Sequence, residues 1–126
     1  MKHIVTHVDT DKDLTTHVVT GDVTGAEIKE ATSAFYENDP TMLVLWDFTE
    51  ADVQLVTSAD IEMIVNVSLR YGGLRVGGKT ATLFASPLGY GLGRMYNTHQ
   101  ELGGSSKRRA GFRDRDEALA WLFTVD

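Results

Sequence analysis

The chain has 126 residues, of which 42% are hydrophobic and 24% charged, and this composition predicts one domain, residues 1–126, with a single core. It has no cysteine, so disulfides, thiolate metal ligands and a cysteine nucleophile are excluded. The net charge of −6 disfavours general nucleic-acid binding, and no apolar run reaches the ~20 residues of a membrane span, so we expect a cytoplasmic protein.

The N-terminal part of the chain predicts a hairpin followed by a helix. Residues 3–8 and 14–20 are rich in β-branched residues and are separated by a polar turn, a pattern typical of two antiparallel strands. Thr24 and Glu27 have the spacing of a capping box, in which each residue bonds the backbone of the other. Apolar residues then recur at helical spacing until residues 38–40, which end the helix.

The middle of the chain predicts two more strands around a second helix. Residues 41–48 are apolar without alternation, as expected for a parallel strand that is buried on both faces. Residues 57–60 begin the helix, and Gly72 follows its end. Residues 79–85 have the composition of the next strand.

The C-terminal third predicts a helix that begins at Ser86, a short strand over residues 107–112, and a last helix. We expect the last helix to begin with a second capping box between Asp114 and Glu117. The element order is therefore ββαβαβαβα. Strands that alternate with helices predict an α/β fold, with a single mixed sheet and helices packed on it.

The stretch SPLGYGLGRMY, residues 86–96, raises the question of a nucleotide-binding loop. A dinucleotide fingerprint needs a third glycine where this chain has Arg94, and a P-loop needs a Gly-Lys-Ser/Thr that does not follow. Ser86 and Pro87 suit instead the N-cap and the first position of a helix. The stretch therefore indicates the start of a helix.

The glycines of this helix have two interpretations: close packing on the sheet, or a first turn whose bare amides bind an anion. We favour packing, because Gly89 and Gly91 fall at the margins of the apolar face. Tyr90 and Arg94 share the solvent side and can stack. The apolar face itself is predicted to contain Leu88, Leu92, Met95, Tyr96 and His99.

Three histidines lie on the predicted hairpin. If Val5 faces His17, then His3, His7 and His17 share one face of the sheet and could bind a metal ion. We favour surface histidines and expect no metal or other cofactor, because no carboxylate is fixed nearby.

Asp47 and Ser86 follow predicted strands, at the edge where open α/β sheets bind ligands. A serine hydrolase would need a G-x-S-x-G elbow and a nearby base, whereas His99 lies far along the helix. Capping explains Ser86 better, and Asp47 is either an acid or base or a turn residue.

Basic residues gather near the C-terminus. The run 107–109, with Arg113 and Arg115, could hold an anion or an acidic partner. We favour the other interpretation, a solvated edge strand protected by charge.

Three segments resemble STAS domains, the fold of the SpoIIAA anti-sigma-factor antagonists, and are most similar to the SpoIIAA-like family. They are LVLWDFT (43–49), KTATLFASPLGYGLGRMY (79–96) and GFRDRDEALAWL (111–122), and the similarity covers roughly the last two-thirds of the chain. It implies a mostly uncharacterised family of cytoplasmic bacterial proteins, related to STAS regulatory domains and to the CRAL-TRIO lipid-binding fold.

In STAS antagonists a phosphorylatable serine follows the central strand within Asp-x-Ser-Gly. The resemblance places Thr49 at the serine position, and Glu50 replaces the glycine. A carboxylate beside the acceptor disfavours a dianionic phosphate, so we expect no phosphorylation switch.

The resemblance implies a non-enzymatic regulatory or protein-interaction module that presents a loop, residues 49–58, and the start of a helix, residues 86–94, to a partner. The alternative is a carrier that holds a small amphipathic or lipid-like ligand between sheet and helices, with its anionic head at Arg94 or at the amides near Ser86. An enzyme that uses Asp47 or Ser86 is least favoured, and self-association through an edge strand or an exposed helix stays open. The predicted ligand or partner surface contains Asp47, Thr49, Ser86, Tyr90 and Arg94.

Overall fold

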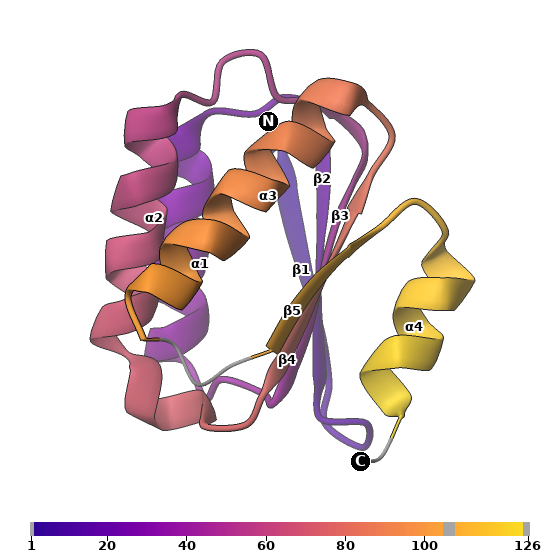
Figure 1. Ribbon diagram of the computed structural model, residues 1–126. Helices are drawn as coiled ribbons and strands as arrows, with labels where there is room; N and C mark the ends of the chain where they lie inside the picture. The colour runs from indigo at the N-terminus through magenta and orange to yellow at the C-terminus, as the bar shows by residue number, and fades with distance from the viewer. Residues whose placement is uncertain (1, 105–107, 125–126) are drawn as a thin grey trace.

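One mixed sheet organises the computed structural model of the protein, which describes residues 2–104 and 108–124 (Figure 1). Its strands lie in the order β1-β2-β3-β4-β5; β1 is antiparallel to β2, and all other neighbours are parallel. The predicted α/β class and single mixed sheet are confirmed. The strands are β1 (Ile4–Asp9), β2 (Leu14–Asp22), β3 (Leu43–Asp52), β4 (Lys79–Phe84) and β5 (Arg108–Phe112).

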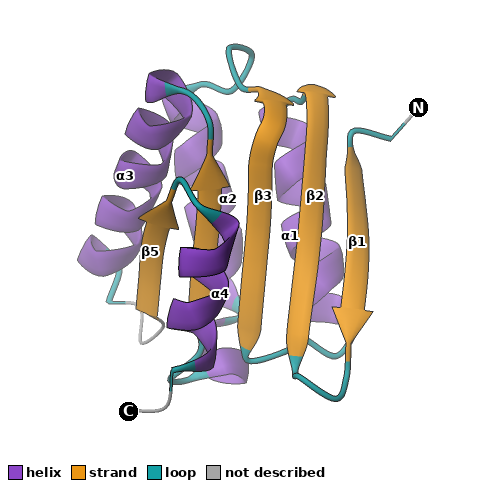
Figure 2. Cartoon of the chain, turned by 90° about the vertical axis from the view of Figure 1, so that its right-hand side faces the viewer, coloured by secondary structure: helices purple, strands orange, loops and turns teal. Residues whose placement is uncertain are grey.

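The helices divide unequally between the two faces of the sheet. The helices α1, α2 and α3 cover one face, and α4 packs alone on the other, over β3 to β5 (Figures 1 and 2). No helix among the described residues is long and apolar enough to cross a membrane. The helices are α1 (Gly25–Glu37), α2 (Ser58–Arg70), the short 3-10 helix η1 (Gly72–Arg75), α3 (Pro87–Leu102) and α4 (Arg115–Phe123).

Side-chain caps begin the helices largely as predicted. Thr24 Oγ1 accepts a hydrogen bond from the Glu27 backbone N–H at 3.2 Å, and the Glu27 carboxylate accepts one from the Thr24 N–H at 2.9 Å. The first capping box is therefore confirmed. At α4 the Asp114 carboxylate accepts from the Asp116 N–H at 3.0 Å, so Asp114 caps the helix without the predicted partner Glu117.

The central strand β3 is longer than predicted. The pairing of β2 with β3 changes register between Val18, opposite Asp47, and Thr20, opposite Glu50, so β3 contains one extra residue there. The polar residues 49–52 continue the strand beside the end of β2, and the prediction of a loop there is wrong. Bulges of this kind re-aim side chains at the ends of sheets.

The hairpin register separates the histidines. Val5 pairs with Val18 and not with His17, so His7, two residues from Val5, lies on the opposite face of the sheet from His17. His3 precedes β1. The alternative of one face with three imidazoles therefore does not hold. The favoured interpretation, surface histidines, is wrong for His17, which is 1% exposed. Within residues 2–104 and 108–124, no group of three or more His, Asp or Glu side chains could hold a metal ion.

Candidate functional site

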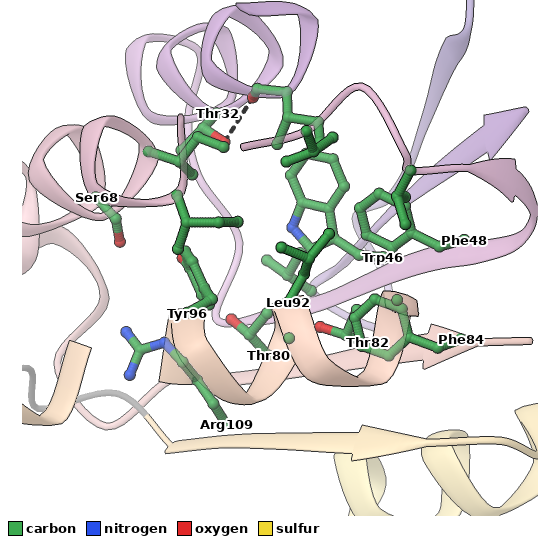
Figure 3. Close-up of a pocket in the computed structure, with 18 of the residues that line it drawn as sticks. Thr32, Trp46, Phe48, Ser68, Thr80, Thr82, Phe84, Leu92, Tyr96 and Arg109 are labelled. Atoms are coloured by element: carbon green, nitrogen blue, oxygen red, sulfur yellow. Dashed lines mark hydrogen bonds between the residues drawn. The ribbon is translucent and has the colours of Figure 1, made fainter. Parts of the chain in front are cut away.

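A cavity of about 80 Å³ lies between the sheet and the three helices that cover its inner face (Figure 3). Side chains of β3 and β4 form its floor, and apolar residues of α1, α2 and α3 form most of its walls. At ~10–15 Å³ for each enclosed water, this volume corresponds to about six waters, so the space is a true gap in the packing.

Aromatic side chains line one end of the cavity. Trp46 and Phe48 alternate along β3, so both face the helices, and their ring centroids lie 5.9 Å apart. Phe84 of β4 pairs with Phe48, and these two rings stack at 5.5 Å. The row forms a flat apolar shelf (Figure 3).

Helix α3 approaches this shelf through glycines. A Cβ on Gly89 would lie 2.8 Å from Phe84 Cδ1, and one on Gly93 would lie 2.6 Å from Phe84 Cζ, whereas Gly91 has open space around it. Close packing is confirmed for Gly89, but the second contact belongs to Gly93 and not to Gly91. Leu88, predicted on the apolar face, is 52% exposed.

Alanine substitutions should separate these glycines. Gly93→Ala should destabilise the protein by about 1–3 kcal/mol, because the Phe84 ring has to move. Gly91→Ala meets no atom within 4 Å and should stabilise it by about 0.5–1 kcal/mol through helix propensity. Urea denaturation of both variants measures the difference. Equal effects of the same sign would contradict the packing role of Gly93.

Arg75 closes the opposite end of the cavity. Its side chain is 2% exposed, and all five of its N–H groups donate hydrogen bonds to neutral oxygens. No carboxylate pairs with it among the described residues. The acceptors are the carbonyl oxygens of Thr41, Met42 and Lys79 and the hydroxyl oxygens of Tyr36 and Thr80, at 2.7–3.5 Å.

His17 lies beside the cavity wall. Its ring stacks on Trp46 at 4.0 Å and meets Phe35 edge-on at 5.8 Å, and its Nδ1 is 2.8 Å from Thr6 Oγ1. Its buried Nε2 has no hydrogen-bond partner. Burial first, and the charge of Arg75 second, lower the pKa of His17 to about 4, so the imidazole is neutral at pH 7.

Polar groups from β4 and β5 complete the cavity floor. Thr80 and Thr82 alternate along β4 and face the cavity, and Arg109 of β5 is opposite Thr80 in the sheet (Figure 3). The Arg109 Nη2 group donates to Gln100 Oε1 at 2.9 Å, and its guanidinium carbon lies 6.0 Å from the Tyr96 ring centroid.

Two solved structures share this arrangement of sheet and helices. One is an uncharacterised protein from the DUF3478 family with a SpoIIAA-like fold, from Shewanella loihica PV-4, which is 18% identical with a TM-score of 0.60 over 94% of this chain and 91% of that one. The other is the unphosphorylated anti-sigma factor antagonist SpoIIAA, 14% identical with a TM-score of 0.58 over 97% and 99%. The chain has a SpoIIAA-like fold. No family model and no curated protein matches its sequence.

Asp47, predicted from its place at the end of a strand, and Thr49, predicted from the SpoIIAA resemblance, lie outside the cavity lining. Asp47 Oδ1 accepts hydrogen bonds from the Thr49 backbone N–H at 2.9 Å and from its hydroxyl at 2.6 Å, and Arg115 Nη1 lies 3.5 Å from Oδ2. The structure therefore brings Asp47 and Thr49 together. Thr49 lies within β3, however, and not after it. The hydroxyl residues after the strand in this SpoIIAA-like fold are Thr57, which caps α2, and Ser58.

The three predicted site residues near α3 have separate surroundings. Ser86 caps the helix as predicted, by accepting from the Gly89 N–H at 3.0 Å. Tyr90 is half-buried, with the Arg113 guanidinium 4.9 Å from its ring centroid, and Arg94 is exposed. The predicted stacking of Tyr90 with Arg94 is wrong, because the chain after β5 brings Arg113 to this ring.

The basic segment is also divided by the strand. Lys107 lies outside the described residues, and alternation along β5 puts Arg108 and Arg109 on opposite faces of the sheet. Only Arg109 of this run belongs to the cavity lining. Sequence reasoning missed the cavity residues Arg75, Thr80 and Thr82; the one local signal was the Thr-x-Thr alternation within a buried strand.

Proposed function

We propose that the protein is a non-enzymatic, cytoplasmic binding module that holds a small amphipathic molecule between α3 and the sheet. The observation that carries this proposal is the cavity, which has an aromatic end and a polar end. Asp47 and Ser86, the residues considered for catalysis, do not line it. Each has a structural role, Asp47 at the bulge of β3 and Ser86 at the N-cap of α3. Such a pocket, apolar with a few placed polar groups, is typical of ligand sites.

The size of the cavity limits the ligand. Its 80 Å³ is below the ~150 Å³ of an engineered apolar cavity that takes up benzene, so a ligand larger than a short chain requires α3 to move. Among the residues of α3, Gly89 and Gln100 are buried, and the rest are half-buried or exposed. Movement of this helix therefore costs less buried area than movement of α1 or α2 would.

Binding of 1-hexanol tests this proposal. The protein should bind the alcohol in titration calorimetry with quenching of Trp46 fluorescence, and native mass spectrometry of protein purified without refolding should show a bound molecule. Thr82→Leu should abolish binding, because Thr82 faces the cavity (Figure 3) and a larger apolar side chain fills it. Thr16→Leu, on the opposite face of the sheet, is the matched control. If Thr82→Leu binds 1-hexanol as tightly as the wild-type protein does, the alcohol binds outside this cavity.

A regulatory protein-interaction module is the second candidate. It is supported by the likeness of the fold to an anti-sigma factor antagonist, and by the polar group of Asp47, Thr49 and Arg115 on the sheet face that carries α4. If the wild-type protein carries no ligand and binds no hexanol, this function, with an unidentified protein partner, is the one that remains.

A further inference from the structure

We propose that the ligand of this cavity is a monoanion, a short-chain or small aromatic carboxylate, whose charged end lies at Arg109 and Thr80 beside the guanidinium of Arg75. This inference rests on the proposed function and names the chemical class of its ligand. The tail of the molecule lies on the shelf of Trp46, Phe48 and Phe84.

The charge of the cavity lining favours an anion. The described residues that line the cavity include Arg75 and Arg109 and no Asp or Glu. Arg75 in particular is buried among neutral oxygens, without a counter-ion among the described residues. A buried cation with no counter-ion is costly, and it creates a positive potential in the adjoining space. A carboxylate in the cavity would supply the missing charge.

The hydroxyl of Thr80 supplies a donor beside this charge. Its Oγ1 accepts a hydrogen bond from Arg75 Nη1 at 3.2 Å, so its own proton remains to be donated. Arg75 has no N–H group left, and it acts on the ligand through its charge and by orienting Thr80. Because Arg109 is directly opposite Thr80 in the sheet, a carboxylate there would lie between a hydroxyl donor and a second guanidinium.

The location differs from the one expected for an anionic head. Arg94 is exposed, and the Gly89 amide at the start of α3 already donates to Ser86, so neither supplies a donor inside the cavity. At His17, burial lowers the pKa most and the charge of Arg75 lowers it further, so this charge acts on neighbouring groups. The same field keeps a bound carboxylic acid ionised.

A comparison of hexanoate with 1-hexanol tests the charge, because the two probes share a six-carbon chain. Titration calorimetry at pH 7 should give hexanoate an affinity on the order of tenfold higher, the usual effect of a charge-assisted hydrogen bond. Arg109→Met should remove most of this preference, because it should weaken the binding of hexanoate more than the binding of hexanol. Arg108→Met, the neighbouring residue on the other face of β5, is the matched control and should keep the preference.

The outcomes separate this inference from the proposed function. If hexanol binds as tightly as hexanoate, or if Arg109→Met keeps the full preference, the anion site is overturned while the binding function stands. If neither probe binds the wild-type protein, the binding function itself fails. The comparison in the wild-type protein needs no variant, so the inference stays testable even if Arg109→Met does not fold.

Discussion

Replacement of Arg75 by methionine should destabilise the protein by about 3–5 kcal/mol, because buried oxygen atoms lose the N–H groups that donate to them. The side chain joins η1 to α1, to the segment before β3 and to the first residues of β4 through five hydrogen bonds. Methionine has a similar length but no hydrogen-bond donor. The buried carbonyl oxygens of Thr41 and Lys79 would therefore each lose the N–H group of Arg75 that donates to them. Each loss costs about 1–3 kcal/mol.

Two further substitutions show whether geometry or charge is responsible. Arg75→Lys keeps the charge but has three donors without the planar fork, so it should recover only part of the loss. Arg70→Met, at the exposed end of α2, makes the same chemical change and should shift stability by about 0.5 kcal/mol or less. Urea denaturation measures the free energy of unfolding of all three variants, and we expect the m-value to be unchanged. A loss within about 1 kcal/mol of zero for Arg75→Met would contradict its role.

Local signals in the sequence predicted where most elements begin and end. The capping box of Thr24 and Glu27 and the cap at Ser86 depend on residues three positions apart, so they can be recognised without the fold. The register of the hairpin depends on turn geometry, and a shift of one residue places His17 on the other face. The length of β3 likewise depends on pairing with β2, which no local pattern shows.

The cavity could not be predicted for a related reason. Arg75 follows two glycines in an irregular segment and Arg109 lies in a basic run, so both have the sequence features of surface residues. Arg75 is buried and Arg109 contacts the cavity only because segments far apart in the sequence meet in the folded chain. The glycines of α3 were recognisable as packing residues, but which of them meets Phe84 depends on the rotation of the helix. Charge inside the fold was therefore the least predictable property.

The free energy of unfolding should fall by up to about 3 kcal/mol as the pH decreases from about 6.5 to 4, because of His17. Its pKa is about 4 in the folded protein, against the ordinary value of 6.5 for a histidine side chain. In this window the unfolded chain takes up a proton that the folded protein does not, so the full stability is present above pH 6.5 and is lost toward pH 4. A difference of about 2.5 pKa units corresponds to about 3 kcal/mol.

Two histidine variants identify the source of this pH dependence. His17→Phe keeps an aromatic ring against Trp46 and cannot titrate, so its stability should change little between pH 6.5 and 4. His7→Gln, at an exposed position of β1, should retain the wild-type fall. Glu27, whose pKa is lowered chiefly by its hydrogen bond to His3, contributes stability that is lost only below the ordinary pKa of a glutamate, 4.5. Its titration therefore affects mainly the acid end of the profile.

A profile for His17→Phe as steep as that of the wild-type protein would show that another group is responsible. Because the charge of Arg75 is the second cause of the shift, Arg75→Met should also reduce the steepness, which links the two expected results through one buried pair.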